Sequence, residues 1–182
     1  MSDKPQVRKR QPELVRQQLL QSAARLATEL GVGAVTVSAV AQAAGVTKGG
    51  FFHHFPSKQA LIEGLFDDML QQLDSDIDQF IAEDPLPYGS FTRAYVKVAF
   101  LDNQQERGWA ALSFTMLTDV DLTVKWDSWL AKRLEKHQQT DSDAQLEVIR
   151  LAADGVWLAS LVHRSKKFCH AESQLLSMTL GD

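Results

Sequence analysis

Cationic, hydroxyl-bearing and side-chain-free residues are concentrated in one short stretch of the sequence, residues 36–58. Thr36 and Thr47 each stand where a helical pattern begins, and Lys48 and His53 follow the second threonine. Hydroxyl and ammonium groups donate hydrogen bonds to phosphate oxygens, and lysine or histidine can also reach the edges of bases in the major groove. These residue types predict a surface that binds the backbone of DNA and reads its bases.

Two short helical patterns position these residues. The first begins at Thr36 and stops at Gly45, and the second begins at Thr47 and runs to about His54 before Pro56 ends it. Threonine suits the N-cap of a helix, and glycine tolerates the tight turn between two helices. The pattern therefore predicts a helix-turn-helix whose second helix enters the major groove.

The whole stretch resembles the DNA-binding core of the tetracycline-repressor (TetR) family of bacterial regulators. The residues that match the family pattern are Thr36, Val37, Val40, Ala41, Ala44, Gly45, Val46, Thr47, Gly49, Phe51, Phe52, His54, Phe55, Ser57, Lys58 and Leu61. The match is gap-free and covers about the first third of the chain. The resemblance implies an all-α protein of about nine helices, with an N-terminal three-helix domain that binds DNA and a helical domain for ligand binding and dimerisation.

Nine residues are predicted to contact DNA. They are Thr36, Thr47, Lys48, Gly49, Gly50, Phe52, His53, His54 and Lys58. Lys48 and His53 are the candidates for base contacts, although Lys48 could bind phosphate instead. Thr36, Thr47 and the pair His54 and Lys58 are candidates for phosphate contacts.

Gly49, Gly50 and Phe52 are the unusual members of this set. Two glycines in a helix cost about 1 kcal/mol each relative to alanine, so they indicate either a loose helix or a backbone that lies close to DNA. The resemblance favours close approach at Gly49. The family usually carries tyrosine at position 52, where a hydroxyl bonds a phosphate; phenylalanine lacks that bond, worth roughly 1 kcal/mol, and can stack on a sugar or pack inward.

Composition bounds the class of protein. The chain has 182 residues, 45% of them hydrophobic and 23% charged, which suits one globular unit or two closely packed ones. We expect no membrane span and no signal peptide, because long apolar runs are absent from the sequence. A single cysteine, Cys169, excludes an internal disulfide and fits the cytoplasm.

Charge is divided unevenly along the chain. Residues 1–58 carry eight Lys or Arg and three Asp or Glu (8 − 3 = +5), whereas residues 59–182 carry eleven and twenty (11 − 20 = −9). A basic head on an acidic body indicates that the head meets a polyanion. Residues 1–11 are predicted to be a flexible basic arm, which either contacts DNA or is a solvated tail.

Helical periodicity continues to the end of the sequence. The predicted helices span residues 12–30, 36–44, 47–55, 57–82, 91–104, 107–118, 121–139, 142–165 and 171–179. We expect a DNA-binding domain over residues 1–56 and a ligand-binding and dimerisation domain over residues 57–182. The fourth helix is either a plain connection or, as the family implies, a lever between the domains.

The eighth predicted helix is apolar nearly all round, which indicates burial on two sides. One side can meet the core of its own chain and the other a second copy, as the resemblance also implies for the last two helices. The alternative is a central core helix of a monomer. The predicted dimer contacts are Ile149, Ala153, Val156, Trp157, Ser160, Leu175 and Leu176.

Aromatic residues gather between the fifth and seventh predicted helices and could line a pocket for a small apolar or amphipathic ligand. The candidates are Phe66, Phe100, Trp109, Ser113, Phe114, Met116, Trp126 and Trp129. Ordinary core packing is the alternative for each of them.

Motifs of catalysis are missing from the sequence: it contains no glycine-rich phosphate loop, no H-E-x-x-H, no nucleophile elbow and no paired cysteine site. His163 and His170 near Cys169 would suit a thiol site, but a plain surface thiol is the much simpler explanation. His53 and His54 are adjacent and point apart on a helix, which disfavours metal binding. We therefore predict no enzyme activity, no cofactor and no metal.

The predicted function is a homodimeric, sequence-specific repressor that binds a palindromic operator in double-stranded DNA and is released by a small ligand. The alternative is a ligand-independent DNA-binding regulator whose C-terminal domain only dimerises or docks a protein. Sequence does not separate a repressor from an activator.

Overall fold

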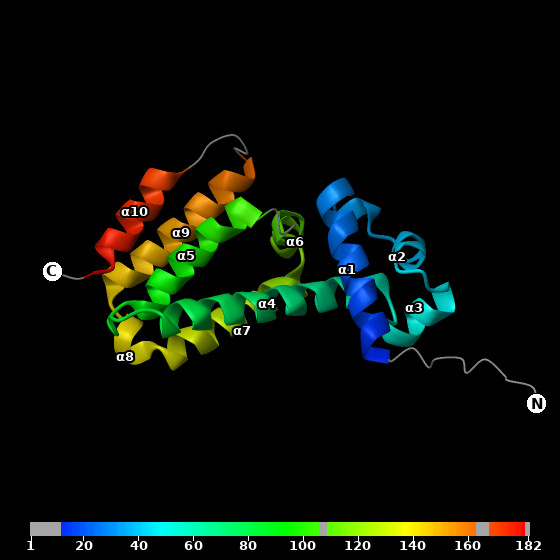
Figure 1. Ribbon diagram of the computed structural model, residues 1–182, viewed down its shortest axis with the longest axis horizontal. Helices are drawn as coiled ribbons and strands as arrows, with labels where there is room; N and C mark the ends of the chain where they lie inside the picture. The colour runs from blue at the N-terminus through cyan, green and yellow to red at the C-terminus, as the bar shows by residue number, and fades with distance from the viewer. Residues whose placement is uncertain (1–11, 106–108, 163–167, 181–182) are drawn as a thin grey trace, which may run out of the picture. The chain divides into compact units, whose positions relative to one another are not determined.

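The computed structural model describes residues 12–105, 109–162 and 168–180, and these residues form helices and no strand (Figure 1). The prediction of an all-α fold is confirmed. The chain divides into two compact units, the first ending at Leu65 and the second beginning at Phe66. The division lies inside one helix, and the predicted domain boundary between residues 56 and 57 stays a prediction.

The first unit is a bundle of short helices. It comprises α1 (Pro12–Leu30), the 3-10 turn η1 (Val32–Ala34), α2 (Val37–Ala43), α3 (Lys48–His54) and the start of α4 (Lys58–Ala82). Its core consists of side chains with almost no exposed surface: Leu19, Ala23, Val35, Val40, Phe51 and Leu61. All of them except Val35, which precedes α2, belong to the apolar faces of helices, and burial of these side chains holds the bundle together.

The turn between α2 and α3 is built on Gly45, which has a φ of 65°. The Gly45 N–H donates to the carbonyl of Gln42 (3.1 Å), and the Val46 N–H donates to the carbonyl of Ala41 (2.9 Å). This paired arrangement is the Schellman motif, which needs a residue that tolerates the left-handed region. Gly45 thus redirects the chain from α2 into α3 as predicted.

The inner face of α3 is aromatic. Phe51 and Phe55 are buried, and their ring centroids lie 6.0 Å apart. Gly64 of α4 packs so closely against Phe55 that an added Cβ would lie 3.0 Å from its Cε1 atom and 3.4 Å from Cδ2 of Leu20. This close packing fixes how α3 is rotated and so which of its residues face outward.

The second unit contains the rest of α4 and six further helices. They are α5 (Ser90–Gln105), α6 (Trp109–Met116), α7 (Val120–Lys136), α8 (Gln138–Asp141), α9 (Ala144–Val162) and α10 (Cys169–Met178). α5 and α9 lie side by side along most of their lengths (Figure 1). Their buried faces and that of α7 supply the core, including Phe91, Val96, Leu122, Leu146 and Ile149.

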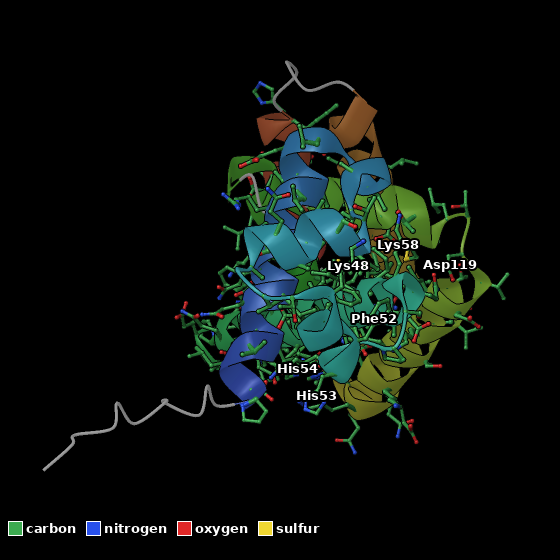
Figure 2. All side chains as sticks on the ribbon, turned by 90° about the vertical axis from the view of Figure 1, so that its right-hand side faces the viewer. Lys48, Phe52, His53, His54, Lys58 and Asp119 are labelled. Carbon is green, nitrogen blue, oxygen red and sulfur yellow. The ribbon has the colours of Figure 1, made fainter. Side chains whose placement is uncertain are left out.

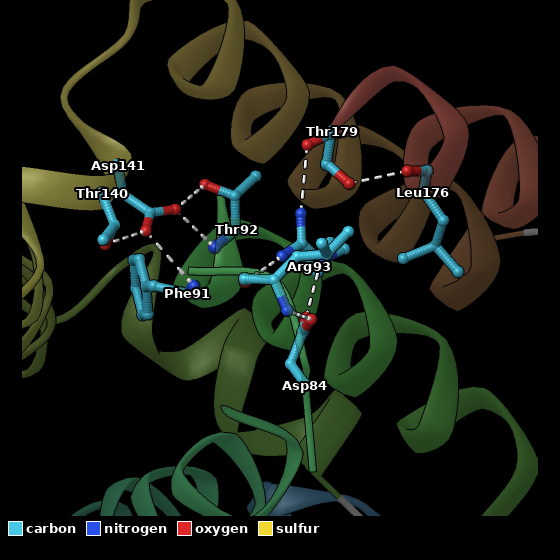
Figure 3. Close-up of polar contacts among 9 residues, drawn as sticks. Asp84, Phe91, Thr92, Arg93, Thr140, Asp141, Leu176 and Thr179 are labelled. Carbon is cyan, nitrogen blue, oxygen red and sulfur yellow. Dashed lines mark hydrogen bonds and ion pairs between the residues drawn. The ribbon is translucent and has the colours of Figure 1, made fainter. Parts of the chain in front are cut away.

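The seventh helix ends earlier than predicted. It stops at Lys136, and a single turn, α8, follows where we expected the helix to continue to residue 139 and then a polar turn. Asp141 closes this turn and is buried, accepting hydrogen bonds from the Thr92 N–H (2.8 Å) and the Thr92 hydroxyl (2.6 Å) (Figure 3). The Phe91 N–H donates to its other oxygen (3.3 Å). Asp141, the last residue of α8, therefore caps the start of α5 although it is about 50 residues away in the sequence.

A buried ion pair anchors the beginning of α5 on the other side. Arg93 donates to Asp84 (2.6 Å), to the carbonyl of Leu86 (2.6 Å) and to the carbonyl of Thr179 (3.1 Å) (Figure 3). The side chains of Arg93 and Asp84 are each only 6% exposed. One guanidinium thus joins the loop before α5 to the end of α10.

Charged side chains hold α7 along α4. Arg133 bridges Asp74 (2.5 Å) and Asp78 (2.5 Å), and Trp129 Nε1 donates to Asp74 (2.7 Å). Lys125 pairs with Asp67 (2.6 Å) about two turns further along both helices. Since Arg133 is buried while its acids are half exposed, these bonds satisfy an otherwise costly buried charge.

Among the residues that the structure describes, no helix is both long enough and apolar enough to cross a membrane. Groups of three or more metal-ligating side chains are also absent from that part of the chain.

Candidate DNA-binding site and ligand cavity

The outer face of α3 carries the predicted DNA contacts. Thr47, Lys48, Gly49, Phe52 and His53 are exposed. Gly50 and His54 are partly exposed, and Thr36 and Lys58 are exposed at the starts of α2 and α4. Figure 2 looks onto the α3 side of this unit, where Lys48, Phe52, His53, His54 and Lys58 are labelled. The first unit therefore places all nine predicted residues on accessible surface.

Hydroxyl caps define the starts of three helices in this unit. The Thr36 hydroxyl oxygen accepts from the Ala39 N–H (3.1 Å), that of Thr47 from the Gly50 N–H (3.0 Å), and that of Ser57 from the Ala60 N–H (3.0 Å). In each cap the oxygen accepts and the hydroxyl proton stays available to donate. A capping threonine can therefore donate to a phosphate without giving up its structural bond.

The two glycines of α3 are not required by packing within the chain. A Cβ at Gly49 would meet Thr47 Oγ1 at 3.8 Å, and a Cβ at Gly50 would meet the same atom at 3.4 Å. Both distances are ordinary contacts, and neither glycine has a positive φ. Because alanine would favour the helix, the fold alone does not explain a glycine at position 49.

Phe52 points outward and does not pack inward. It is 50% exposed, and only the edge of its ring meets Phe51, with centroids 5.4 Å apart and planes at 84°. Of the two alternatives that the sequence left open, the structure favours a free aromatic face. An exposed ring beside Lys48 and His53 can stack on a sugar or a base.

The segment that forms α2 and α3 carries no acidic side chain. No Asp or Glu occurs between Glu29 and Glu63, whereas Lys48 and Lys58 lie in that interval. The predicted basic arm, residues 1–11, lies outside the described residues. Even without it, the face around α3 has the sign that a phosphate backbone attracts.

A cavity of about 250 Å³ lies in the second unit, between α4, α5, α6, α7 and α9. Its apolar walls include Met69, Leu73, Val98, Met116, Leu117 and Leu158. Two tryptophans, Trp126 and Trp157, also face it. Its polar groups are Ser113, Tyr95 and Asp154.

Tyr95 and Asp154 form a hydrogen-bonded pair in the cavity wall. The Tyr95 hydroxyl donates to Asp154 Oδ1 at 2.6 Å. Burial raises the pKa of Asp154, and the hydrogen bond from Tyr95 and the charge of Arg150 only partly oppose that rise. Burial and the Asp154 charge raise the pKa of Tyr95 well above its ordinary value, so the phenol stays protonated.

The cavity has different walls from those that the sequence predicted. Ser113, Met116 and Trp126 line it as expected, but Phe66 and Phe100 are buried in the core away from the lining. Trp129 instead donates to Asp74. Trp109 and Phe114 belong to α6, but their side chains lie outside those described. Tyr95 and Asp154 were missed, because their pairing joins residues 59 apart in sequence.

The outer face of α9 is an exposed apolar stripe formed by Val148, Leu151, Gly155 and Leu158, with Leu151 63% exposed. Three of the predicted dimer contacts lie elsewhere: Ile149, Ala153 and Leu175 are buried within the chain, which leaves them no surface for a partner. We revise the prediction at these positions. The other four, Val156, Trp157, Ser160 and Leu176, are partly exposed.

The geometry defines an all-helical protein with an exposed, non-acidic helix-turn-helix and a separate unit with an apolar cavity. Two family models match this chain: bacterial regulatory proteins of the tetR family over residues 19–65, and the tetracyclin repressor-like C-terminal domain over residues 89–176. The chain belongs to the tetracycline-repressor family of bacterial transcriptional regulators, as the resemblance predicted.

Two relatives of this chain are named as transcriptional repressors. The HTH-type transcriptional repressor KstR2 of Mycolicibacterium smegmatis is 40% identical over 63 residues, which are 35% of this chain and 31% of that protein. KstR2 of Rhodococcus jostii is 27% identical over 158 residues and covers 79% of this chain and 77% of that protein. The first match therefore spans less than a third of the relative.

Solved structures show the same fold. A putative transcriptional regulator from Pseudomonas aeruginosa PAO1 superposes with a TM-score of 0.73 at 17% identity, covering 94% of this chain and 92% of that one. The multidrug binding protein EbrR, solved in complex with malachite green, gives 0.72 at 15% identity and covers 91% and 98%. At such identities the likeness concerns the fold alone.

Proposed function

We propose that this protein is a dimeric repressor that binds a palindromic operator through α3 and leaves it when a compact ligand fills the cavity of the second unit. The observation that carries the proposal is the outer face of α3, where Lys48, His53 and the capping Thr47 are exposed beside Gly49, a glycine without a packing role. The family supports it, since the relatives are transcriptional repressors. The site of action is then the bacterial cytoplasm.

The reading of DNA is divided between side chains that position and side chains that specify. Thr36, Thr47, His54 and Lys58 bind phosphates, while Lys48 and His53 contact base edges, and Gly49 allows the backbone to approach. Two copies of α3 in a dimer reach successive major grooves about 34 Å apart. The operator therefore has two-fold symmetry.

The stripe on α9 supports a homodimer. Val148, Leu151 and Leu158 expose apolar side chains at helical spacing, and Gly155 between them lets a second helix approach closely. Met178 at the end of α10 adds a further exposed apolar side chain. A second copy packed on this stripe covers surface that a monomer leaves in water.

The dimer is tested by placing a charge on the stripe. Sedimentation should show the unmodified protein as a dimer and Leu151→Glu as a folded monomer, because the carboxylate would be buried in an apolar interface. Gln71→Glu, an exposed position on α4, is the matched control and should remain dimeric. If the Leu151→Glu variant stays dimeric, the stripe on α9 is not the dimer interface.

The cavity supports release by a ligand. It is apolar with a few polar groups, as binding sites for small molecules are. A ligand that prefers the conformation incompatible with the operator shifts the population away from DNA, with a coupling of typically 1–3 kcal/mol. The neighbour EbrR was solved in complex with malachite green, which supports the idea that this fold can hold a small-molecule ligand.

Selection from random duplexes tests the proposal. The purified chain should enrich one palindrome with two half-sites about one helical turn apart. Recovery of no preferred sequence would refute the proposed function. Thermal stabilisation of the protein by no apolar compound would favour the alternative, a regulator whose second unit only dimerises or docks a protein.

A further inference from the structure

The acidic group in the cavity wall, Asp154, forms no ion pair within the described part of the chain, although the charge of Arg150 acts on it from a distance. Asp154 accepts one hydrogen bond, from the neutral Tyr95 hydroxyl, and its Oδ2 atom has no hydrogen-bond partner among the described residues. The Asp154 side chain lines the cavity beside Trp157, its third neighbour along α9. A carboxylate in such surroundings is costly unless a positive charge compensates it.

The nearest cation of the same helix is committed elsewhere. Arg150 lies one turn before Asp154 on α9, but its Nη1 atom donates to the Thr92 hydroxyl (2.6 Å) and to the carbonyl of Asp141 (3.3 Å). Asp141, in turn, is buried and is bonded by Thr92. Arg150 therefore bonds to the network at the start of α5, and its charge only partly offsets the effect of burial on Asp154.

Aromatic rings complete the surroundings of that charge. Trp126 from α7 and Trp157 from α9 both face the cavity, and Tyr95 supplies a third ring. Aromatic faces attract cations within about 6 Å, most strongly when water is excluded. At about 250 Å³, the cavity is slightly smaller than the usual range of roughly 300–1,000 Å³ for ligand pockets, so its ligand must be compact.

We propose that the cavity binds a compact, largely apolar molecule with one ammonium group, whose N–H donates to Asp154 Oδ2 while Trp126 and Trp157 cover its apolar body. Tyr95 is a positioning residue, because its hydroxyl holds Oδ1 and turns the free oxygen toward the ligand. The inference rests on the proposed function, since it gives the releasing ligand a chemical class.

Three probes of nearly equal shape test the class: 1-naphthylmethylammonium, 1-naphthylmethanol and 1-naphthoate, each titrated by calorimetry into the full chain without DNA. The ammonium compound should bind at least about tenfold more tightly than the alcohol, and the carboxylate most weakly. Equal binding of alcohol and ammonium, tightest binding of the carboxylate, or no binding of any probe would overturn the inference.

Variants separate charge from shape. Asp154→Asn should reduce the ratio between ammonium and alcohol affinities to about one while the alcohol binds nearly as before. Tyr95→Phe should reduce the ratio partially, because the carboxylate keeps its charge and loses its orientation. Asp127→Asn, an exposed acid of α7 away from the cavity lining, is the control and should leave the ratio unchanged. A ratio that survives Asp154→Asn would refute the role of Asp154.

This ratio is read within one variant, so a general loss of stability does not mimic the predicted effect. Failure of the probes and failure of the proposed function are also distinguishable. Calorimetry measures only the binding of the probes, because no DNA is present. The proposed function is tested separately and fails if selection from random duplexes recovers no operator.

Discussion

Replacing Gly49 by alanine should stabilise the protein and weaken its binding to DNA, two effects that a purely structural glycine would not show together. A Cβ at position 49 meets nothing closer than Thr47 Oγ1 at 3.8 Å, and the residue lies in α3 without a positive φ. Alanine is favoured over glycine in a helix interior by about 0.5–1 kcal/mol. The free energy of unfolding should therefore rise by about that amount.

The loss in DNA affinity follows from the same methyl group. If the α3 backbone approaches the DNA at Gly49, a methyl group separates them and lengthens neighbouring bonds to phosphates. A hydrogen bond to a charged group contributes about 1.5–3 kcal/mol. Loss of even one in each half-site costs at least about 3 kcal/mol, which predicts a reduction in affinity of at least about a hundredfold for a dimer.

Two measurements decide this prediction: urea unfolding followed by circular dichroism, and fluorescence anisotropy on the selected operator. Gly33→Ala is the matched control, because a Cβ there also meets nothing within 4 Å but the residue belongs to η1 and not to α3. The control should leave DNA affinity unchanged. Gly49→Ala with undiminished affinity would show that the α3 backbone does not approach DNA closely.

Two further predictions concern how the free energy of unfolding depends on pH. Burial alone would raise the pKa of Asp84, but hydrogen bonds from Arg93 and from the Leu86 N–H hold that pKa below its ordinary value. The Asp84–Arg93 ion pair therefore stabilises the fold above about pH 4, and this contribution is lost as the pH falls further. Asp84→Ala should lower the free energy of unfolding by about 3–5 kcal/mol at pH 7 and by less at pH 3; an equal loss at both pH values in urea titrations would contradict this. Burial, with help from the Lys136 charge, lowers the pKa of His137, so its contribution is present above about pH 6.5 and is lost as the pH falls. His137 stacks on Phe91 at 5.2 Å, and its Nε2 is buried without a hydrogen-bond partner in the described part of the chain. His137→Phe should therefore raise stability by about 1–3 kcal/mol at pH 7.5 and by more at pH 5, and a gain that shrinks in acid would refute the assignment.

Local signals made the helix-turn-helix predictable from sequence. The cap at Thr47 and the turn at Gly45 depend on bonds between residues three to five positions apart, which sequence spacing displays directly. The outward position of Phe52 could not be predicted, because it depends on how Phe51 and Gly64 pack the inner face of α3.

The second unit was less predictable, because its features depend on distant contacts. The sequence predicted a polar turn at Asp141, yet this side chain is buried and accepts a hydrogen bond from Thr92, 49 residues earlier in the chain. Tyr95 and Asp154 meet only because α5 and α9 pack together. A helix that is apolar nearly all round does not reveal which face its own chain buries, so Ile149 and Leu151 could not be told apart by periodicity.

The central claim, that the outer face of α3 reads DNA, is tested most directly by comparing Lys48→Ala with Lys58→Ala on the selected operator and on variants with single base changes. If Lys48 contacts bases, its loss should cost about 1–3 kcal/mol and relax preference at one or two base pairs. If Lys58 contacts only phosphate, its loss should weaken binding to every sequence alike and reduce the salt slope by about one unit per protomer. Retention of full affinity and unchanged base preference by Lys48→Ala would contradict the account.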